Sequence, residues 1–370
     1  MELKGIKMKD KKRITYWDIA KGITIVLVII GHTGDIPLGL RSLIFSFHMP
    51  LFFWANAVFI KNFNIKKLLT KSSRSLLVPY VVTCLISAGL CVYRNNDINT
   101  NYIVFRNKVI DMFVGISRAS TRFNRFGSVW LVWFVACLFV ARFIYVVVMK
   151  CIHKLPYIVQ IIIIMILCMS GYYIGTKVAF LPWSADVSLF SLPLFWFGNH
   201  MNDMESWLDR IITMRGDENK TKKHGVRLIK PCIVILLTVI WLALCKKGFW
   251  IEMATRRYPG VIVCLVCAMC GIVFIVAVSR IIDRYDNPLR SFLIWCGSNS
   301  MIILIFHCIE MRFFQWDAYI YLALPCSVDG IWYREAIVKA SLIIVASYMV
   351  VAIKEWLMGL TEQKTDEVLS

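Results

Sequence analysis

The chain has 370 residues, of which 59% are hydrophobic, and its mean hydropathy is +0.66. This content exceeds the roughly half-apolar composition of soluble domains and excludes a soluble globular enzyme. The formal net charge of +19 comes from basic residues dispersed between apolar segments. It therefore indicates positively charged cytoplasmic loops of a membrane protein, and excludes a basic domain that binds nucleic acid.

Apolar segments of about 18 residues or more predict membrane-spanning helices. None of them has the short alternating pattern of an outer-membrane β-barrel. The predicted fold class is therefore all-α, a polytopic transmembrane helical bundle with about ten spans. The predicted spans are 16–33, 43–60, 75–93, 128–149, 157–175, 183–200, 231–246, 258–279, 291–310 and 334–357.

The basic connections predict the orientation of the bundle. The N-terminal arm and the connections 61–74, 201–230 and 280–290 are basic and fall on one side when the spans are counted. The positive-inside rule makes that side the cytoplasm and puts both termini there. The basic connection from Arg94 to Arg125 falls outside, and either forms an amphipathic segment or faces an anionic substrate. The predicted parts are a cytoplasmic basic arm 1–14, a single membrane domain 15–360 and a cytoplasmic tail 361–370.

The first predicted span carries Lys21 near its start and His32 near its end, with ten residues between them. At about 100° per residue both side chains lie on one helix face, roughly 16 Å apart along the axis. Ionisable groups at that depth indicate a functional site, although a lone histidine can also be a packed structural residue. His48 lies near the start of the second span. The chain turns back after the first span, so His48 either lies beside His32 in one site or only forms part of the start of its helix.

Two carboxylates lie close to these residues in the sequence. Asp18 follows Thr15 by three positions, which matches a capping box, and it could alternatively pair with Lys21. Asp35, three residues after His32, could hold the imidazole tautomer as the carboxylate of a catalytic triad does, or could be a plain loop residue.

These patterns resemble the membrane acyltransferase 3 family, in its branch of fucose 4-O-acetylase-like and polysaccharide O-acetyltransferases. The family signature has a basic residue, ten residues and a histidine, which Lys21 and His32 reproduce with lysine in place of the commoner arginine. The resemblance continues through the segments FHMPLFF at Phe47–Phe53, SVWLVWFVACLF with Trp130, Trp133 and Phe134, LPWSADVSLFSLPLFWFG, and NPLRSFLIWCGSNSMIILIFH ending in His307.

The resemblance implies a multi-pass protein of the bacterial cytoplasmic membrane that transfers an acyl group, more narrowly acetyl, from acyl-CoA to a hydroxyl of a cell-surface or extracellular polysaccharide or its lipid-linked precursor. His32 would be the general base, helped by His48, because histidine titrates near neutral pH. A covalent acyl-histidine intermediate would use the same residues. The expected partners are acyl-CoA, the glycan and the lipid bilayer, with no nucleic acid and no permanently bound cofactor.

The resemblance also implies binding residues. Lys71 and Arg74 match a paired basic element, and together with Lys21 they would bind the phosphates of the donor, although positive-inside bias also explains them. The expected substrate-binding residues are Trp130, Trp133, His307 and Glu310, and Asp186 is a further candidate for the cavity wall.

Other interpretations stay open at this stage. A glycan flippase or transporter would use the same buried charges for recognition, and a non-catalytic membrane partner could keep the same fold. The chain has 13 cysteines, and the repeated spacing of Cys264, Cys267 and Cys270 lies on one apolar span, where packing explains it better than a metal site.

Overall fold

The computed structural model describes residues 14–60, 63–95, 97–115, 129–204, 206, 220–314 and 331–369, with the backbone alone at 130, 220–230, 331 and 359–369. Within these ranges the chain is helical and has no strand; one isolated antiparallel bridge pairs Glu252 with Arg257. The prediction of an all-α fold is confirmed for the described residues.

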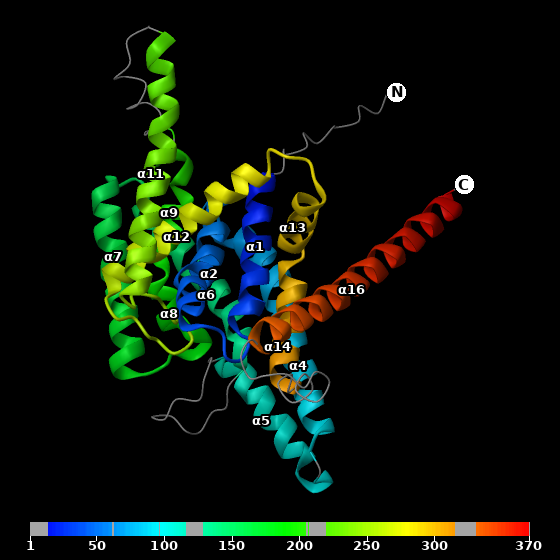
Figure 1. Cartoon of the computed structure of the whole chain (residues 1–370). Coiled ribbons are helices and arrows are strands. Elements are labelled where there is room, and N and C mark those ends of the chain that lie inside the picture. The colour runs from blue at the N-terminus through cyan, green and yellow to red at the C-terminus, as the bar shows by residue number, and fades with distance from the viewer. Residues whose placement is uncertain are drawn as a thin grey trace, which may run out of the picture.

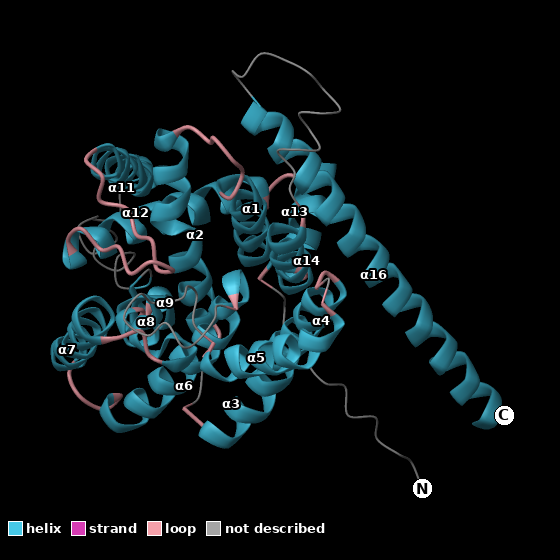
Figure 2. Cartoon of the chain, turned by 90° about the horizontal axis from the view of Figure 1, so that it is seen from below, coloured by secondary structure: helices cyan, strands magenta, loops and turns pink. Residues whose placement is uncertain are grey.

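The helices pack into one bundle, with α1 near its centre and with α7 and α16 on opposite sides (Figures 1 and 2). The main helices are α1 (Thr15–Gly31), α2 (Leu38–Val58), α3 (Ile65–Ser72), α4 (Val78–Tyr93), α5 (Asn101–Val114), α6 (Trp133–Ile152), α7 (Tyr157–Tyr173), α8 (Ala185–Phe190), α9 (Leu192–Asn199), α11 (Lys220–Lys246), α12 (Val261–Ile282), α13 (Pro288–Ser298), α14 (Ser300–Phe313) and α16 (Ile331–Leu369). The short turns are η1 (Ser73–Leu77), η2 (Ile98–Thr100), η3 (Trp130–Val132), η4 (Ile174–Val178) and η5 (Pro182–Ser184).

Six helices of the described chain are long and apolar enough to cross a membrane. They are Leu38–Val58, Ile65–Tyr93, Trp133–Ile152, Tyr157–Val178, Val261–Ile282 and Trp332–Met358. The helices α13 and α14 form a pair bent by 73° that could serve as a seventh span. The remaining predicted windows correspond to α1, to the broken pair α8 and α9, and to the apolar part of α11.

The predicted span 183–200 is interrupted for local reasons. Trp183 and Ser184 have positive φ, and Pro193 stands just after Ser191, which caps α9. Both features disfavour a continuous helix. The two short helices that result lie deep in the bundle, where Phe190 and Phe195 are fully buried.

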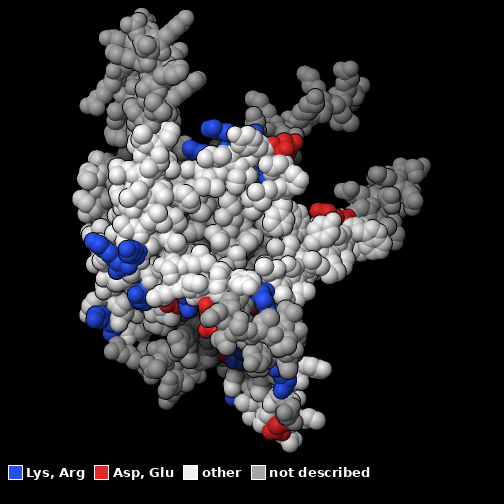
Figure 3. All heavy atoms as spheres, viewed as in Figure 1, with Lys and Arg blue, Asp and Glu red and all other residues white. Residues whose placement is uncertain are grey.

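On the surface that Figure 3 shows, charged side chains are separated by an apolar zone. Figure 3 shows a broad band of uncharged side chains between Lys, Arg, Asp and Glu residues at the upper rim and others lower down. Such a band is what a lipid bilayer requires of the surface that it covers.

Glycines bring α1 and α13 into close contact. A Cβ on Gly22 would collide with the backbone carbonyl of Leu293, and a Cβ on Gly297 would collide with that of Asp18. Small residues at such contacts let helix backbones approach in a membrane protein. The contact fixes α1, which also packs against α2, α12, α14 and α16, so α1 is the helix that positions the candidate site.

The predicted capping box at the start of α1 is wrong. Ile14 is the N-cap residue and makes no side-chain capping bond, while the hydroxyl of Thr15 donates to the carboxylate of Asp283, at 2.8 Å from Oδ1 and 2.6 Å from Oδ2. Asp18 instead accepts from Lys21, with Nζ–Oδ1 at 2.8 Å, which was the alternative interpretation. The hydroxyl of Thr15 therefore binds Asp283, at the end of α12, and the local sequence pattern cannot reveal so distant a partner.

The packing of α1 on α13 generates a first prediction. Replacing Gly297 with alanine forces the two backbones apart, which costs about 1–3 kcal/mol as overpacking does. We expect a lower thermal midpoint of the purified protein in detergent. Gly89→Ala is the matched control: a Cβ there meets nothing within 4 Å, so its midpoint should equal or exceed that of the wild type. Equal midpoints for Gly297→Ala and the wild type would contradict the close packing.

Candidate active site

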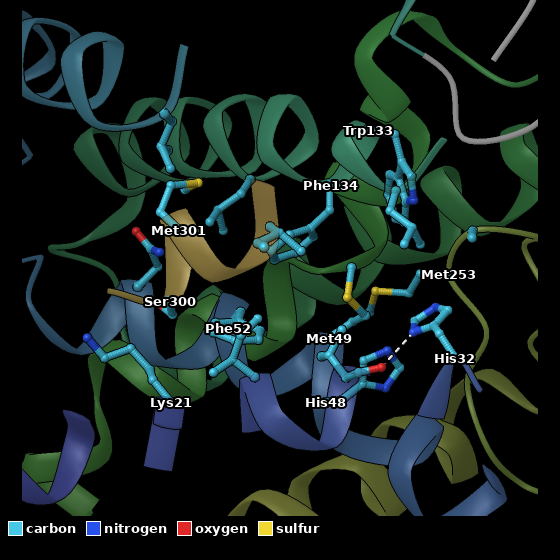
Figure 4. A pocket seen from close by; sticks show the side chains of 18 of the residues that line it. Lys21, His32, His48, Met49, Phe52, Trp133, Phe134, Met253, Ser300 and Met301 are labelled. Atoms are coloured by element: carbon cyan, nitrogen blue, oxygen red, sulfur yellow. Dashed lines mark hydrogen bonds between the residues drawn. The ribbon is translucent and has the colours of Figure 1, made fainter. Parts of the chain in front are cut away.

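A cavity of about 290 Å³ lies between α1, α2, α6 and α14 and is closed on one side by the segment that joins α11 to α12. His32, His48 and Met253 line one end, and Lys21 and Ser300 line the other (Figure 4). The cavity therefore connects an end with imidazoles to an end with a cation, along the face of α1 that the spacing of Lys21 and His32 predicts.

His32 lies at the C-cap position of α1 and is partly buried. Its Nδ1 is 2.8 Å from the carbonyl oxygen of Val28. Because a carbonyl only accepts, Nδ1 carries the hydrogen and Nε2 keeps the lone pair. The end of the helix thus sets the tautomer that a general base or a nucleophile needs.

His48 repeats this arrangement on the neighbouring helix. It lies inside α2, not at its start, and its Nδ1 donates to the carbonyl of Ile44 at 2.9 Å. Its ring centre is 6.2 Å from that of His32, with Phe45 packed against both rings at 4.7 and 5.4 Å. The structure therefore places two imidazoles with the same tautomer beside one cavity.

Asp35 does not hold the tautomer of His32. Its side chain is exposed on the loop after α1, at a residue with a φ of 48°. The Nδ1 hydrogen that it was expected to accept is donated to Val28. The carbonyl at the helix end removes the need for a carboxylate.

The cationic end of the cavity contains residues that the sequence analysis missed. Arg142 lines the cavity, with Nη1 at 3.2 Å from Oδ1 of Asn56, and its Nε is buried with no hydrogen-bond partner among the described residues. Asn56 lies eight residues after His48 on α2, about 12 Å along the helix axis, so Arg142 stands away from the imidazoles and toward the end where Lys21 lies. Arg142 is an arginine inside the predicted span 128–149, and a charge at such depth is a signal that could have identified it. Together with Lys21, whose Nζ also pairs with Oδ1 of Asp18 at 2.8 Å, it supplies this end with cations that suit an anion.

Lys71 and Arg74 are exposed on α3 and the turn that follows, and do not line the cavity. The next two residues, Ser75 and Leu76, do line it. A second, open groove of about 660 Å³ adjoins the start of α3, and its charged lining residues are Lys66, Lys67 and Lys150. In the sequence, Lys71 and Arg74 therefore lie between the residues that line this groove and those that line the cavity.

The aromatic residues of α6 form part of the cavity wall. Trp133 and Phe134 line it although both are almost completely buried. The ring of Phe134 packs edge-on against Phe53 at 5.2 Å. The side chain of Trp130 lies outside the described residues.

His307 and Glu310 do not form the cavity wall, contrary to prediction. His307 is fully buried, its ring centre is 5.3 Å from that of His32, and its Nδ1 is 3.2 Å from Oε2 of Glu310. The bend between α13 and α14 directs both side chains between helices, which periodicity alone does not reveal. The pair stands behind His32 as seen from the cavity.

Asp186 is also absent from the wall and has a structural partner. Its carboxylate binds Arg256 in a buried ion pair, with Nε–Oδ2 at 2.8 Å and Nη2–Oδ1 at 3.1 Å. Arg256 also donates to the carbonyl of Ala254 at 3.0 Å. The ion pair therefore anchors the segment that brings Glu252, Met253 and Ala254 to the cavity.

The arrangement suits the transfer of a group from an anionic carrier. Two Nε2 lone pairs are available at one end of the cavity, and the cations of Lys21 and Arg142 stand at the other. The described residues contain no group of three or more His, Cys, Asp or Glu side chains that could hold a metal ion. A histidine-based reaction is the chemistry that these side chains can perform directly.

Comparison with known proteins gives the family. A family model described as an acyltransferase domain matches residues 14–353, nearly the whole chain. No curated protein and no solved structure gives a significant match. With its apolar helices the chain is a multi-pass membrane protein, and it belongs to the membrane acyltransferase 3 family.

Proposed function

We propose that the protein is an O-acyltransferase, specifically an O-acetyltransferase, that moves the acyl group of acyl-CoA to a hydroxyl of a cell-surface or extracellular polysaccharide or its lipid-linked precursor. The observation that carries this proposal is the single cavity shared by Lys21 at one end and His32 with His48 at the other. The family supports acyl transfer; the donor and the acceptor are part of the proposal.

The proposed orientation puts both termini on the cytoplasmic side of a bacterial cytoplasmic membrane. Basic residues support it, because they gather in the N-terminal arm and in the connections 61–74, 201–230 and 280–290. Lys21 is near the start of α1 and so faces the cytoplasmic half, whereas His32 at its end faces the outer half. The donor would enter from the side where acyl-CoA is made.

The cationic residues would bind the donor. Lys21 and Arg142 stand at the cytoplasmic end of the cavity in this orientation, where they can receive the pyrophosphate of the donor. Lys71 and Arg74 would add positive charge at its entrance, continued by the lysines of the open groove. The pantetheine arm would then follow the cavity and carry the thioester to His32.

The imidazoles would move the proton. In direct transfer, Nε2 of His32 removes the hydroxyl proton of the acceptor while the new C–O bond forms and the C–S bond breaks, and the thiolate regains a proton. In the covalent variant, Nε2 of His32 takes the acyl group first, and His48 then has the free Nε2 that removes the hydroxyl proton. Both routes use His32, and the covalent route also requires His48 to share the cavity with it, as it does.

Replacing His32 with alanine tests the function. We expect acyl transfer to fall by at least about 100-fold because general-base catalysis is lost, with donor affinity unchanged because His32 lies at the far end of the cavity from Lys21. The assay follows labelled acetyl-CoA and a panel of methyl glycosides with the purified protein in nanodiscs. His200→Ala, at a histidine that does not line the cavity, is the control. Full transfer by His32→Ala, or none by the wild type with every glycoside, would refute the proposal.

A second variant tests donor binding. Replacing Lys21 with methionine removes one cation from the proposed pyrophosphate site, so we expect KM for acetyl-CoA to rise about 10-fold with a smaller change in kcat, as for loss of a charge-assisted hydrogen bond. Steady-state kinetics at fixed ionic strength measure both constants. Lys154→Met, an exposed lysine outside the cavity and the groove, should leave KM unchanged. Equal KM values for Lys21→Met and the wild type would place the phosphates elsewhere.

A further inference from the structure

A third imidazole stands directly behind the proposed reaction centre and is the most completely enclosed of the three. His307 is fully buried and contacts the ring of His32 at 5.3 Å, with the ring planes at 64°. Its Nε2 is buried with no hydrogen-bond partner among the described residues. A buried polar atom left unpaired is costly in a native structure and calls for an explanation, of which a role in catalysis is one.

The partner of Nδ1 distinguishes His307 from the other two histidines. The Nδ1 hydrogens of His32 and His48 are donated to backbone carbonyls, whereas that of His307 is directed at the carboxylate of Glu310. A carboxylate stabilises an imidazolium far better than a neutral carbonyl does, because the hydrogen bond becomes a charge-assisted pair. His307 is therefore the imidazole of the cluster that is best supported for holding a second proton.

Further contacts pair Glu310 with a cation and connect it to the loop after His32. Lys339 on α16 places its Nζ 3.4 Å from Oε1 of Glu310 and 2.5 Å from Oε1 of Glu335. The other oxygen of Glu335 accepts the backbone N–H of Gly34 at 2.9 Å. Glu310, Lys339 and Glu335 thus form one buried charged cluster. It contacts His307, which packs against His32, and it also binds the loop that follows His32.

We propose that His307, supported by Glu310, accepts the proton that His32 removes from the acceptor hydroxyl. The hydroxyl proton moves to Nε2 of His32, and from there through one water to the lone pair on Nε2 of His307. His307 becomes an imidazolium beside the Glu310 carboxylate, and His32 returns to its neutral state. The proton comes back by the same path to the thiolate that leaves, so that alcohol and thioester become ester and thiol. This inference rests on the proposed function.

The enclosure of His307 gives this relay a purpose. A proton left on His32 has access to the cavity, because His32 lines it. On His307 the proton is out of contact with solvent and stays available for the thiolate. His307 and Glu310 act through His32, and so they are positioning residues that do not touch the substrates.

The test uses His307→Gln and Glu310→Gln in the full-length protein in nanodiscs, with acetyl-CoA and the methyl glycoside that the wild type acetylates fastest. Glutamine at 307 keeps an N–H donor for Glu310 but cannot accept a proton to form a cation, and glutamine at 310 keeps the shape but not the charge. We expect each variant to lower kcat about 10–100-fold with both KM values within about twofold of the wild type, as for a lost proton-transfer step. The double variant should be no slower than the slower single variant, because the two residues act as a unit.

Two controls separate this role from a structural one. Glu310→Asp keeps the carboxylate and should recover part of kcat, and His200→Gln, at a buried histidine whose Nδ1 is bonded to the carbonyl of Trp196 at 2.9 Å, should leave kcat unchanged. A wild-type kcat in either glutamine variant would overturn the relay. The relay would also be overturned if Glu310→Asp lost as much kcat as Glu310→Gln. It would be overturned as well if the variants had lower thermal midpoints and their losses of kcat multiplied in the double variant. Failure of the proposed function is seen separately, as full transfer by His32→Ala.

Discussion

The hydrogen bond from Nδ1 of His32 to the carbonyl of Val28 is the interaction on which the site depends. It satisfies a carbonyl near the end of α1 that has lost its helical partner, and it leaves Nε2 free on the same ring. Because α1 is held against α13 at Gly22 and Gly297, that imidazole has a fixed place inside the bundle. One contact thus satisfies a carbonyl at the end of the helix and sets the tautomer that the proposed base requires.

The geometry of α1 then determines the polarity of the cavity. Eleven positions of an α-helix make about three full turns, so Lys21 and His32 share a face and stand at opposite ends of one hollow. The proposed donor, with a phosphate-rich head and a distant thioester, would therefore lie in this hollow in one direction only. The second imidazole, His48, comes from α2 because a short loop returns the chain beside the end of α1.

Periodicity and spacing predicted what is local to a helix: the all-α fold, the positions of the apolar helices and the shared face of Lys21 and His32. They failed where a partner comes from a distant segment. Spacing favours Asp35 as the partner of His32, but the carbonyl of Val28 takes that place; spacing favours Thr15 as a helix cap, but its hydroxyl binds Asp283.

The same limit explains one further difference. His307 and Glu310 fit the spacing of a polar face, yet the bend between α13 and α14 turns them behind His32.

The central claim is that an acyl donor lies along this cavity with its reactive carbon at His32. A structure of the protein in nanodiscs with a non-hydrolysable acetyl-CoA thioether measures that directly. The account predicts the acyl end beside Nε2 of His32 and the pyrophosphate at Lys21; an analogue bound with its acyl end outside this cavity would contradict it.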